Sequence, residues 1–163
     1  MKIETIIITV LLIFASIITI SCDPMYFKDG RHSTIILKNN SEKDVYVYRY
    51  GNYPDTTINE SYPTSYKFRI VNAGTSNQVR PCPLGDWWEK VFDLDNLQCI
   101  SIFILNATFI EPHMNDENFT VNETMALQRY DLTLEDLNGL DWTISYPPDE
   151  RMKDMKMYPP YGN

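Results

Sequence analysis

Residues 100–105 read Ile-Ser-Ile-Phe-Ile-Leu, the most apolar run of the chain outside its N-terminal segment. A short apolar run that is rich in β-branched and aromatic residues is typical of a buried strand. We therefore expect residues 100–105 to form the central strand of the fold, and we interpret the other segments around it.

Alternating segments on both sides of this run predict further strands. In Val45–Tyr50, two valines share one face and three tyrosines share the other. Turn-forming residues separate this segment from Thr34–Leu37, so we expect the two to pair as a hairpin. Shorter candidate strands are Tyr66–Val71, Gln78–Arg80, Leu127–Tyr130 and Trp142–Tyr146.

Capping residues predict two short helices. Asp86 is followed three residues later by Glu89, which is the spacing of a capping box. Thr133 precedes a second short helix that has acidic residues in its first turn. Polar residues dominate Gly51–Thr64 and Asn106–Thr124, so we expect the first to be a loop and the second a long, exposed excursion.

Short strands joined by long connections favour an all-β fold. We expect an antiparallel, immunoglobulin-like β-sandwich with one or two short crossover helices, and a small α+β fold is the alternative. Hydrophobic residues make up 44% and aromatic residues 13% of the 163 residues, as in folded chains. Residues 34–163 are expected to form this single domain, which is large enough to bury a core without metals.

The N-terminal run Ile6–Cys22 has no charged residue. It is short for a spanning helix, which needs about 20 apolar residues, and it fits the apolar centre of an export signal. Cleavage before Cys22 resembles the processing of bacterial lipoproteins, although Thr19 stands where that pattern prefers an aliphatic residue. We expect residues 1–21 to be the signal peptide, Cys22 to carry acyl chains such as palmitate, and residues 22–33 to be a tether. Simple secretion and an uncleaved anchor are the alternatives.

The remaining cysteines form an even pair if Cys22 carries lipid. In an oxidising compartment we expect Cys82 and Cys99 to form a disulfide that encloses the predicted helix after Asp86. Two free, buried thiols are the alternative.

Aromatic side chains are the strongest candidates for a ligand platform. Trp and Tyr rings combine an apolar face with a polar edge, which suits them to stacking on sugar rings. The alternative is that these large rings fill the core. The residues concerned are Tyr46, Tyr48, Trp87 and Trp88.

Signatures of catalysis and of metal binding are weak. The only histidines are His32 and His113, and no Gly-x-Ser-x-Gly sequence occurs. Residues 93–96 begin like a calcium loop, but the glycine is missing and Ile104 stands where the closing glutamate belongs. We expect a non-enzymatic protein without catalytic residues, metal or cofactor.

The formal net charge is −8, and it is unchanged when the signal is removed. An acidic surface repels phosphate backbones and no basic run is present, so no nucleic acid partner is expected. The expected partners are a membrane, reached through the lipid anchor, and a protein or glycan of unknown identity. Edge-strand pairing in a structural assembly is the alternative role.

Several segments resemble small lipoproteins of Bacteroides-type gut bacteria, a group to which no activity is assigned. They are Lys38–Val47, Tyr53–Asp55, Arg129–Leu137, Trp142–Pro148 and Met157–Tyr161. The resemblance implies a location in the bacterial cell envelope, and we expect the outer rather than the inner membrane. Asp55-Thr56-Thr57 is similar to the O-glycosylation acceptor sequence of the same phylum.

Overall fold

The computed structural model describes residues 30–50, 53–61, 63–64, 67–80, 87–94 and 96–162. Contacts along the chain separate a compact unit, His32–Asn163, from the preceding unit, Met1–Arg31. The expected signal peptide, Cys22 and most of the expected tether lie outside the described residues. The fold below is that of the second unit.

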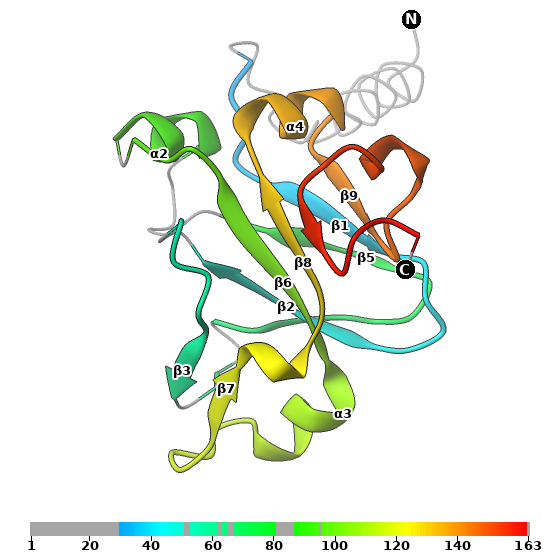
Figure 1. Cartoon of the computed structure of the whole chain (residues 1–163). Coiled ribbons are helices and arrows are strands. Elements are labelled where there is room, and N and C mark those ends of the chain that lie inside the picture. The colour runs from blue at the N-terminus through cyan, green and yellow to red at the C-terminus, as the bar shows by residue number, and fades with distance from the viewer. Residues whose placement is uncertain are drawn as a thin grey trace, which may run out of the picture. The chain divides into compact units, whose positions relative to one another are not determined.

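The described residues form ten strands and several short helices (Figure 1). The longer strands are β1 (Ile35–Asn39), β2 (Val45–Tyr50), β5 (Ser76–Val79), β6 (Ile100–Asn106), β8 (Ala126–Leu132) and β9 (Thr143–Tyr146). The shorter ones are β3 (Asn59–Ser61), β4 (Arg69–Val71), β7 (Thr120–Asn122) and β10 (Met157–Tyr158). The α-helices are α2 (Trp88–Leu94), α3 (Ala107–Ile110) and α4 (Leu134–Gly139), and the 3-10 helices are η1 (Glu111–His113), η2 (Glu123–Met125) and η3 (Glu150–Met152). The expectation of a mainly β fold with few short helices is confirmed.

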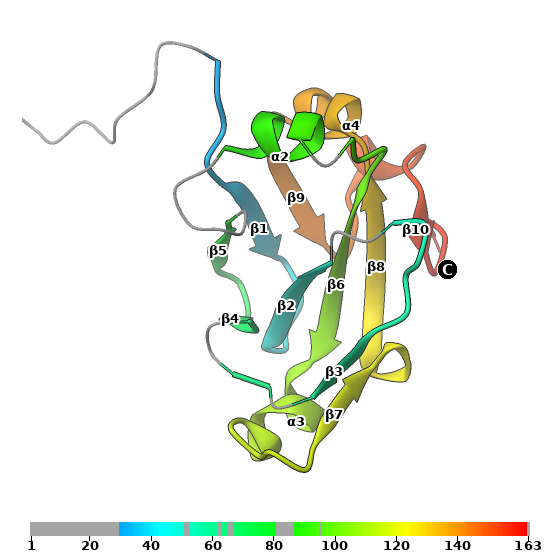
Figure 2. The ribbon, with the colours of Figure 1, turned by 90° about the vertical axis from the view of Figure 1, so that its left-hand side faces the viewer.

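Three sheets organise these strands. The largest has the order β10-β8-β6-β2-β4, the second has the order β5-β1-β9, and β3 pairs with β7 in the third. The pairings are antiparallel except that of β1 with β9, which is parallel. Figure 2 shows the β3–β7 pair in front of the five-stranded sheet and β1 and β9 behind it. The parallel pair departs from the purely antiparallel arrangement expected from the sequence.

Strand β6 is the centre of the five-stranded sheet, as the sequence predicted. It pairs with β2 on one side and β8 on the other, and residues 100–105 are all buried. Ile100, Ile102 and Ile104 belong to one apolar cluster, whereas Phe103 and Leu105 belong to a second. Both faces of the sheet are therefore covered along this strand.

The first cluster joins the two larger sheets. It combines the isoleucines of β6 with Leu37 of β1 and Ile144 of β9, and helices α2 and α4 add Trp88 and Leu137. The Thr133 hydroxyl accepts from the amide of Asp136, whose carboxylate accepts from the Thr133 amide, so the predicted capping residue of α4 forms a full capping box.

The second cluster lies between the five-stranded sheet and the segment from α3 to β7. Ile110 of α3 and Val121 of β7 are fully buried there, as is Ile58 just before β3. The expectation that Asn106–Thr124 is only an exposed excursion is therefore wrong. Single apolar residues stand among the polar ones in this segment, and their side chains cover the second face of the sheet.

The expected hairpin between Thr34–Leu37 and Val45–Tyr50 is also wrong, because β1 and β2 lie in different sheets. The buried Asn39 side chain explains the change of sheet. Its Nδ2 donates to the carbonyl of Lys43 at 2.8 Å and to that of Val71 in β4 at 2.9 Å. These bonds tie the turn after β1 to the five-stranded sheet, and the chain crosses at this corner.

Candidate functional site

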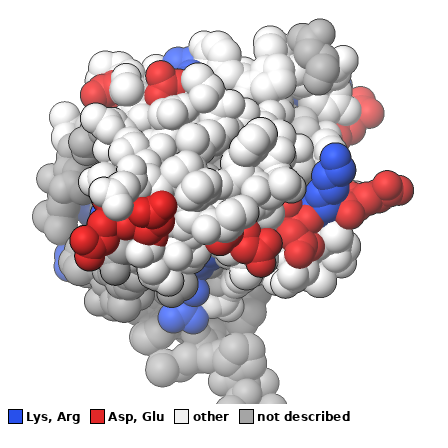
Figure 3. All heavy atoms as spheres, turned by 90° about the horizontal axis from the view of Figure 1, so that it is seen from below, with Lys and Arg blue, Asp and Glu red and all other residues white. Residues whose placement is uncertain are grey.

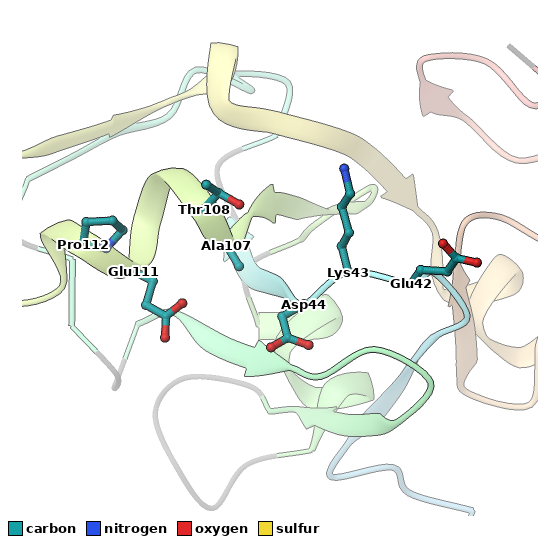
Figure 4. Close-up of a pocket in the computed structure, with 7 residues that line it drawn as sticks. All are labelled: Glu42, Lys43, Asp44, Ala107, Thr108, Glu111 and Pro112. Carbon is teal, nitrogen blue, oxygen red and sulfur yellow. The ribbon is translucent and has the colours of Figure 1, made fainter.

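The turn between β1 and β2 borders two of three adjoining hollows. The largest, of about 710 Å³, lies between this turn and the α3–η1 segment (Figure 4). Asn106, whose side chain caps α3 by accepting from Thr108, positions that segment directly after β6. The residues that line this hollow are Glu42, Lys43, Asp44, Ala107, Thr108, Glu111 and Pro112.

The other two hollows continue the first one. A hollow of about 320 Å³ shares Glu42, Lys43 and Asp44 with the first and is also lined by Leu127 and Tyr146. A third, of about 370 Å³, shares Leu127 and Tyr146 with the second. Because each hollow shares lining residues with the next, the three adjoin one another, and we call this row of hollows the groove.

One end of the groove is acidic. Glu42 and Glu111 are exposed, and neither carboxylate has a partner among the described residues, whereas Asp44 accepts from the amide of Ala73 at 2.8 Å. In Figure 4 the carboxylates of Asp44 and Glu111 lie on the same side, and the Lys43 side chain extends away from them. Burial raises the pKa of the Tyr46 phenol, and the nearby charges of Glu111 and Asp44 raise it further.

The acidic end belongs to a face on which acidic side chains predominate. Figure 3 views the molecule from the end that carries α3 and β7, and acidic groups lie around a largely uncharged middle, with few basic groups. Such a surface favours cationic ligands and repels anionic ones.

The opposite end of the groove is formed by prolines and tyrosines. Two proline pairs follow β9 and β10, and Tyr146 and Tyr161 lie beside them; the proline pairs are Pro147-Pro148 and Pro159-Pro160. Gln128 is 5% exposed and donates from Nε2 to the carbonyl of Pro159 at 2.7 Å. Its Oε1 has no partner among the described residues.

Tyr146 connects the second hollow with the third. Its side chain is partly buried, burial raises the pKa of its phenol, and the hydroxyl has no partner among the described residues. Proline and tyrosine side chains with a few unpaired polar atoms are typical of ligand sites that fix orientation through a small number of hydrogen bonds.

An ionic network centred on the buried Asp131 lies apart from the residues that line the groove. Asp131 of β8 accepts from the Ser101 hydroxyl at 2.8 Å and from Nη2 of Arg129 at 3.2 Å, and Nζ of Lys156 lies 3.7 Å from its Oδ2. Nε of Arg129 is 3.1 Å from Oδ1 of Asp131 but is not aligned for a hydrogen bond.

The two cations of this network reach the segment that precedes β3. Nη1 of Arg129 donates to the Thr56 hydroxyl at 2.8 Å, and Nζ of Lys156 donates to the Tyr53 hydroxyl at 2.7 Å. The network therefore holds this segment against the sheet. Thr56 of the O-glycosylation sequence has its hydroxyl in this bond, whereas Thr57 is exposed.

The four residues predicted as a ligand platform do not share an exposed surface. Trp88 is fully buried in the first cluster, and Tyr46 and Tyr48 are 7% and 8% exposed in the second. Trp87 is partly exposed. The platform prediction is wrong for the three buried residues, because β2 and α2 direct their rings into cores on opposite faces of the sheet.

The predicted disulfide stays a prediction. Cys99 is a buried, free cysteine, and burial with the nearby Asp131 charge raises the pKa of its thiol to about 11. Its expected partner, Cys82, lies outside the described residues.

The described residues contain no cluster of three or more His, Cys, Asp or Glu side chains suited to a metal ion. Among the same residues, no helix has both the length and the apolar character needed to cross a bilayer. His32 lies at the start of the compact unit, where its Nδ1 is 2.6 Å from Oε1 of Glu89 and its ring stacks on Trp142. The sequence did not indicate this pairing.

Comparisons with known proteins add no identification. The chain matches no protein-family model, no curated protein and no solved structure.

Replacing Asp131 with Asn tests the ionic network. The substitution keeps the shape of the side chain but leaves Arg129 and Lys156 without their shared carboxylate, so we expect a loss of about 2–4 kcal/mol in unfolding free energy. Urea unfolding of the full chain in mild detergent, followed by Trp fluorescence, measures the change. The matched control is Glu117→Gln at an exposed carboxylate, expected within about 0.5 kcal/mol of the parent. Equal stability of the two variants would contradict a stabilising role for the network.

Proposed function

We propose that the protein is a lipid-anchored component of a bacterial cell envelope, in the outer rather than the inner membrane. It acts by binding a ligand rather than by catalysis. The uncharged N-terminal run that ends at Cys22 and the resemblance to Bacteroides-type lipoproteins support the anchor and the location. The groove supports the binding role.

The row of three adjoining hollows is the observation that carries this proposal. Turns and short helices that follow β1, β6, β9 and β10 line it, and these strands belong to sheets with buried faces. Loops on a rigid scaffold are a common location for binding sites, because the scaffold limits the entropy lost when the ligand binds.

We also propose that the two larger sheets pack as the layers of an immunoglobulin-like β-sandwich. The first cluster supports this arrangement, because its side chains come from both sheets. The α+β alternative is less favoured, since the α-helices of the described residues are at most seven residues long.

Two other roles receive less support. A glycan-binding accessory role was based on the aromatic platform, most of which is buried. An assembly role based on the Tyr46–Tyr50 strand requires a free edge, but β2 pairs with β6 along its whole length and with β4 at Val45–Val47. Among the described residues this leaves only the short stretch Tyr48–Tyr50 without a second strand partner.

Ligand-induced stabilisation tests the binding role. The full chain in mild detergent is heated with cationic peptides, neutral polysaccharides or anionic polysaccharides, and we expect one class to raise the unfolding temperature. The double variant Glu111→Gln/Tyr146→Phe should lose that increase, and Glu117→Gln, outside the groove, should retain it. The ligand should also be recovered with its mass unchanged. An increase that persists in the double variant would contradict binding in the groove, and a changed ligand mass would indicate an enzyme.

Replacing Cys22 with Ser tests the anchor. Without a thiol no acyl chain can be attached, so we expect the variant to remain unprocessed and to carry no lipid mass. Mass spectrometry of protein from membranes measures both properties, and Cys99→Ser is the matched control for loss of a thiol. Unchanged processing and membrane association of Cys22→Ser would contradict the proposed anchor.

A further inference from the structure

The two ends of the groove differ in chemistry, and this difference restricts the ligand. One end presents the carboxylates of Glu42 and Glu111, which have no partner among the described residues, and the other presents prolines, tyrosines and Gln128. A ligand that contacts both ends must be elongated and must change in character along its length. Peptides in an extended conformation have this property, because each successive side chain can differ.

Gln128 indicates what the proline–tyrosine end binds. Its Oε1 accepts no hydrogen bond among the described residues, and it belongs to a side chain that lines the third hollow. Among the described residues only Nε1 of Trp88 and Nε of Arg129 are fully buried without a partner, so Oε1 of Gln128 is accessible to a donor from water or from a ligand in this hollow. The Tyr146 hydroxyl, which lines the same hollow, is available as a donor.

A peptide in the polyproline II conformation matches this pair of groups. Its backbone makes no internal hydrogen bonds, so its amides and carbonyls need external partners. Grooves lined with aromatic residues bind such chains at a low entropic cost because the conformation is preformed. Gln128 can accept from a peptide amide, Tyr146 can donate to a peptide carbonyl, and the exposed Tyr161 ring offers a surface for proline side chains.

The acidic end selects the charge of the peptide. Glu42 and Glu111 are exposed and have no cationic partner among the described residues, and Figure 4 shows Lys43 extending away from Glu111. The chain as a whole carries a net charge of −8. A lysine or arginine of the ligand therefore gains a favourable charge interaction here, whereas a neutral sugar gains no charge attraction and an anionic one is repelled.

We propose that the groove binds an extended, cationic, proline-containing segment of a partner protein, with its prolines against Tyr146 and Tyr161 and its basic residues beside Glu42 and Glu111. This inference rests on the proposed binding role and specifies its ligand. A glycan ligand is the competing outcome of the test.

Fluorescence anisotropy with labelled nonapeptides tests the inference on the full chain in mild detergent. The probe has three Pro-Pro-Lys repeats; one comparison peptide replaces Lys with Glu, and another replaces Pro with Gly at the same charge. We expect binding of the Pro-Pro-Lys probe at least about tenfold tighter than that of the acidic peptide and about threefold tighter than that of the glycine peptide. Its affinity should decrease as ionic strength rises.

Variants at the two ends of the groove test which residues bind the Pro-Pro-Lys probe. Glu42→Gln/Glu111→Gln should weaken binding of the Pro-Pro-Lys probe about tenfold and reduce its salt dependence. Tyr146→Phe should weaken it about threefold, since one hydrogen bond is lost. The controls are Glu117→Gln and Tyr158→Phe, which remove a carboxylate and a hydroxyl outside the groove and should leave the affinity unchanged.

Three outcomes would overturn the inference. They are equal affinity for the Lys and Glu peptides, an affinity that the groove variants do not change, and the absence of peptide binding. If the peptides do not bind but a polysaccharide stabilises the parent and not Glu111→Gln/Tyr146→Phe, the binding role survives and the peptide inference fails. If the groove variants change the binding of neither the peptides nor the polysaccharides, both proposals fail.

Discussion

The burial of β6 on both faces is the constraint on which the rest of the fold depends. A strand with one buried face needs one covering layer, whereas β6 places isoleucines on one face and Phe103 and Leu105 on the other. The chain must therefore supply two covers. The β5-β1-β9 sheet with α2 and α4 covers the first face, and the segments around α3, β3 and β7 cover the second.

The two covers also create the groove. The chain passes from the first cover to the five-stranded sheet at the corner held by Asn39, and the residues after this corner line the first two hollows. Directly after β6 the chain turns into α3, which supplies the opposite wall. The acidic end of the groove thus lies where the connections between the layers meet.

Local chemistry accounts for the features that the sequence predicted well. The apolar run of β6 and the Thr133 cap of α4 are encoded within a few residues, and both have the predicted form. The hairpin prediction was wrong because Asn39 bonds to Val71, 32 residues away, and turn composition cannot reveal such a partner. The platform prediction was wrong for a related reason. The alternation in β2 separates its tyrosines from its valines, but it does not indicate that a second layer covers them.

The groove was not predictable in the same way. Its walls come from segments more than 100 residues apart, such as the turn at Glu42–Asp44 and the prolines after β9 and β10. The proline pairs are visible in the sequence, but their positions along the chain do not show which residues they face in the folded protein. Oε1 of Gln128 and the carboxylate of Glu111 have no partner among the described residues. No local sequence pattern indicates this, since pairing is a property of the folded chain.

Native-state hydrogen exchange on the full chain tests the central role of β6 most directly. If this strand is buried by both covers, its amides exchange only when the whole domain unfolds. The account predicts that the exchange free energies of Ile102, Phe103 and Ile104 equal the unfolding free energy from denaturant titration. It also predicts lower values in the two-residue strand β10. Exchange of the β6 amides through a local opening well below the global unfolding free energy would contradict the account.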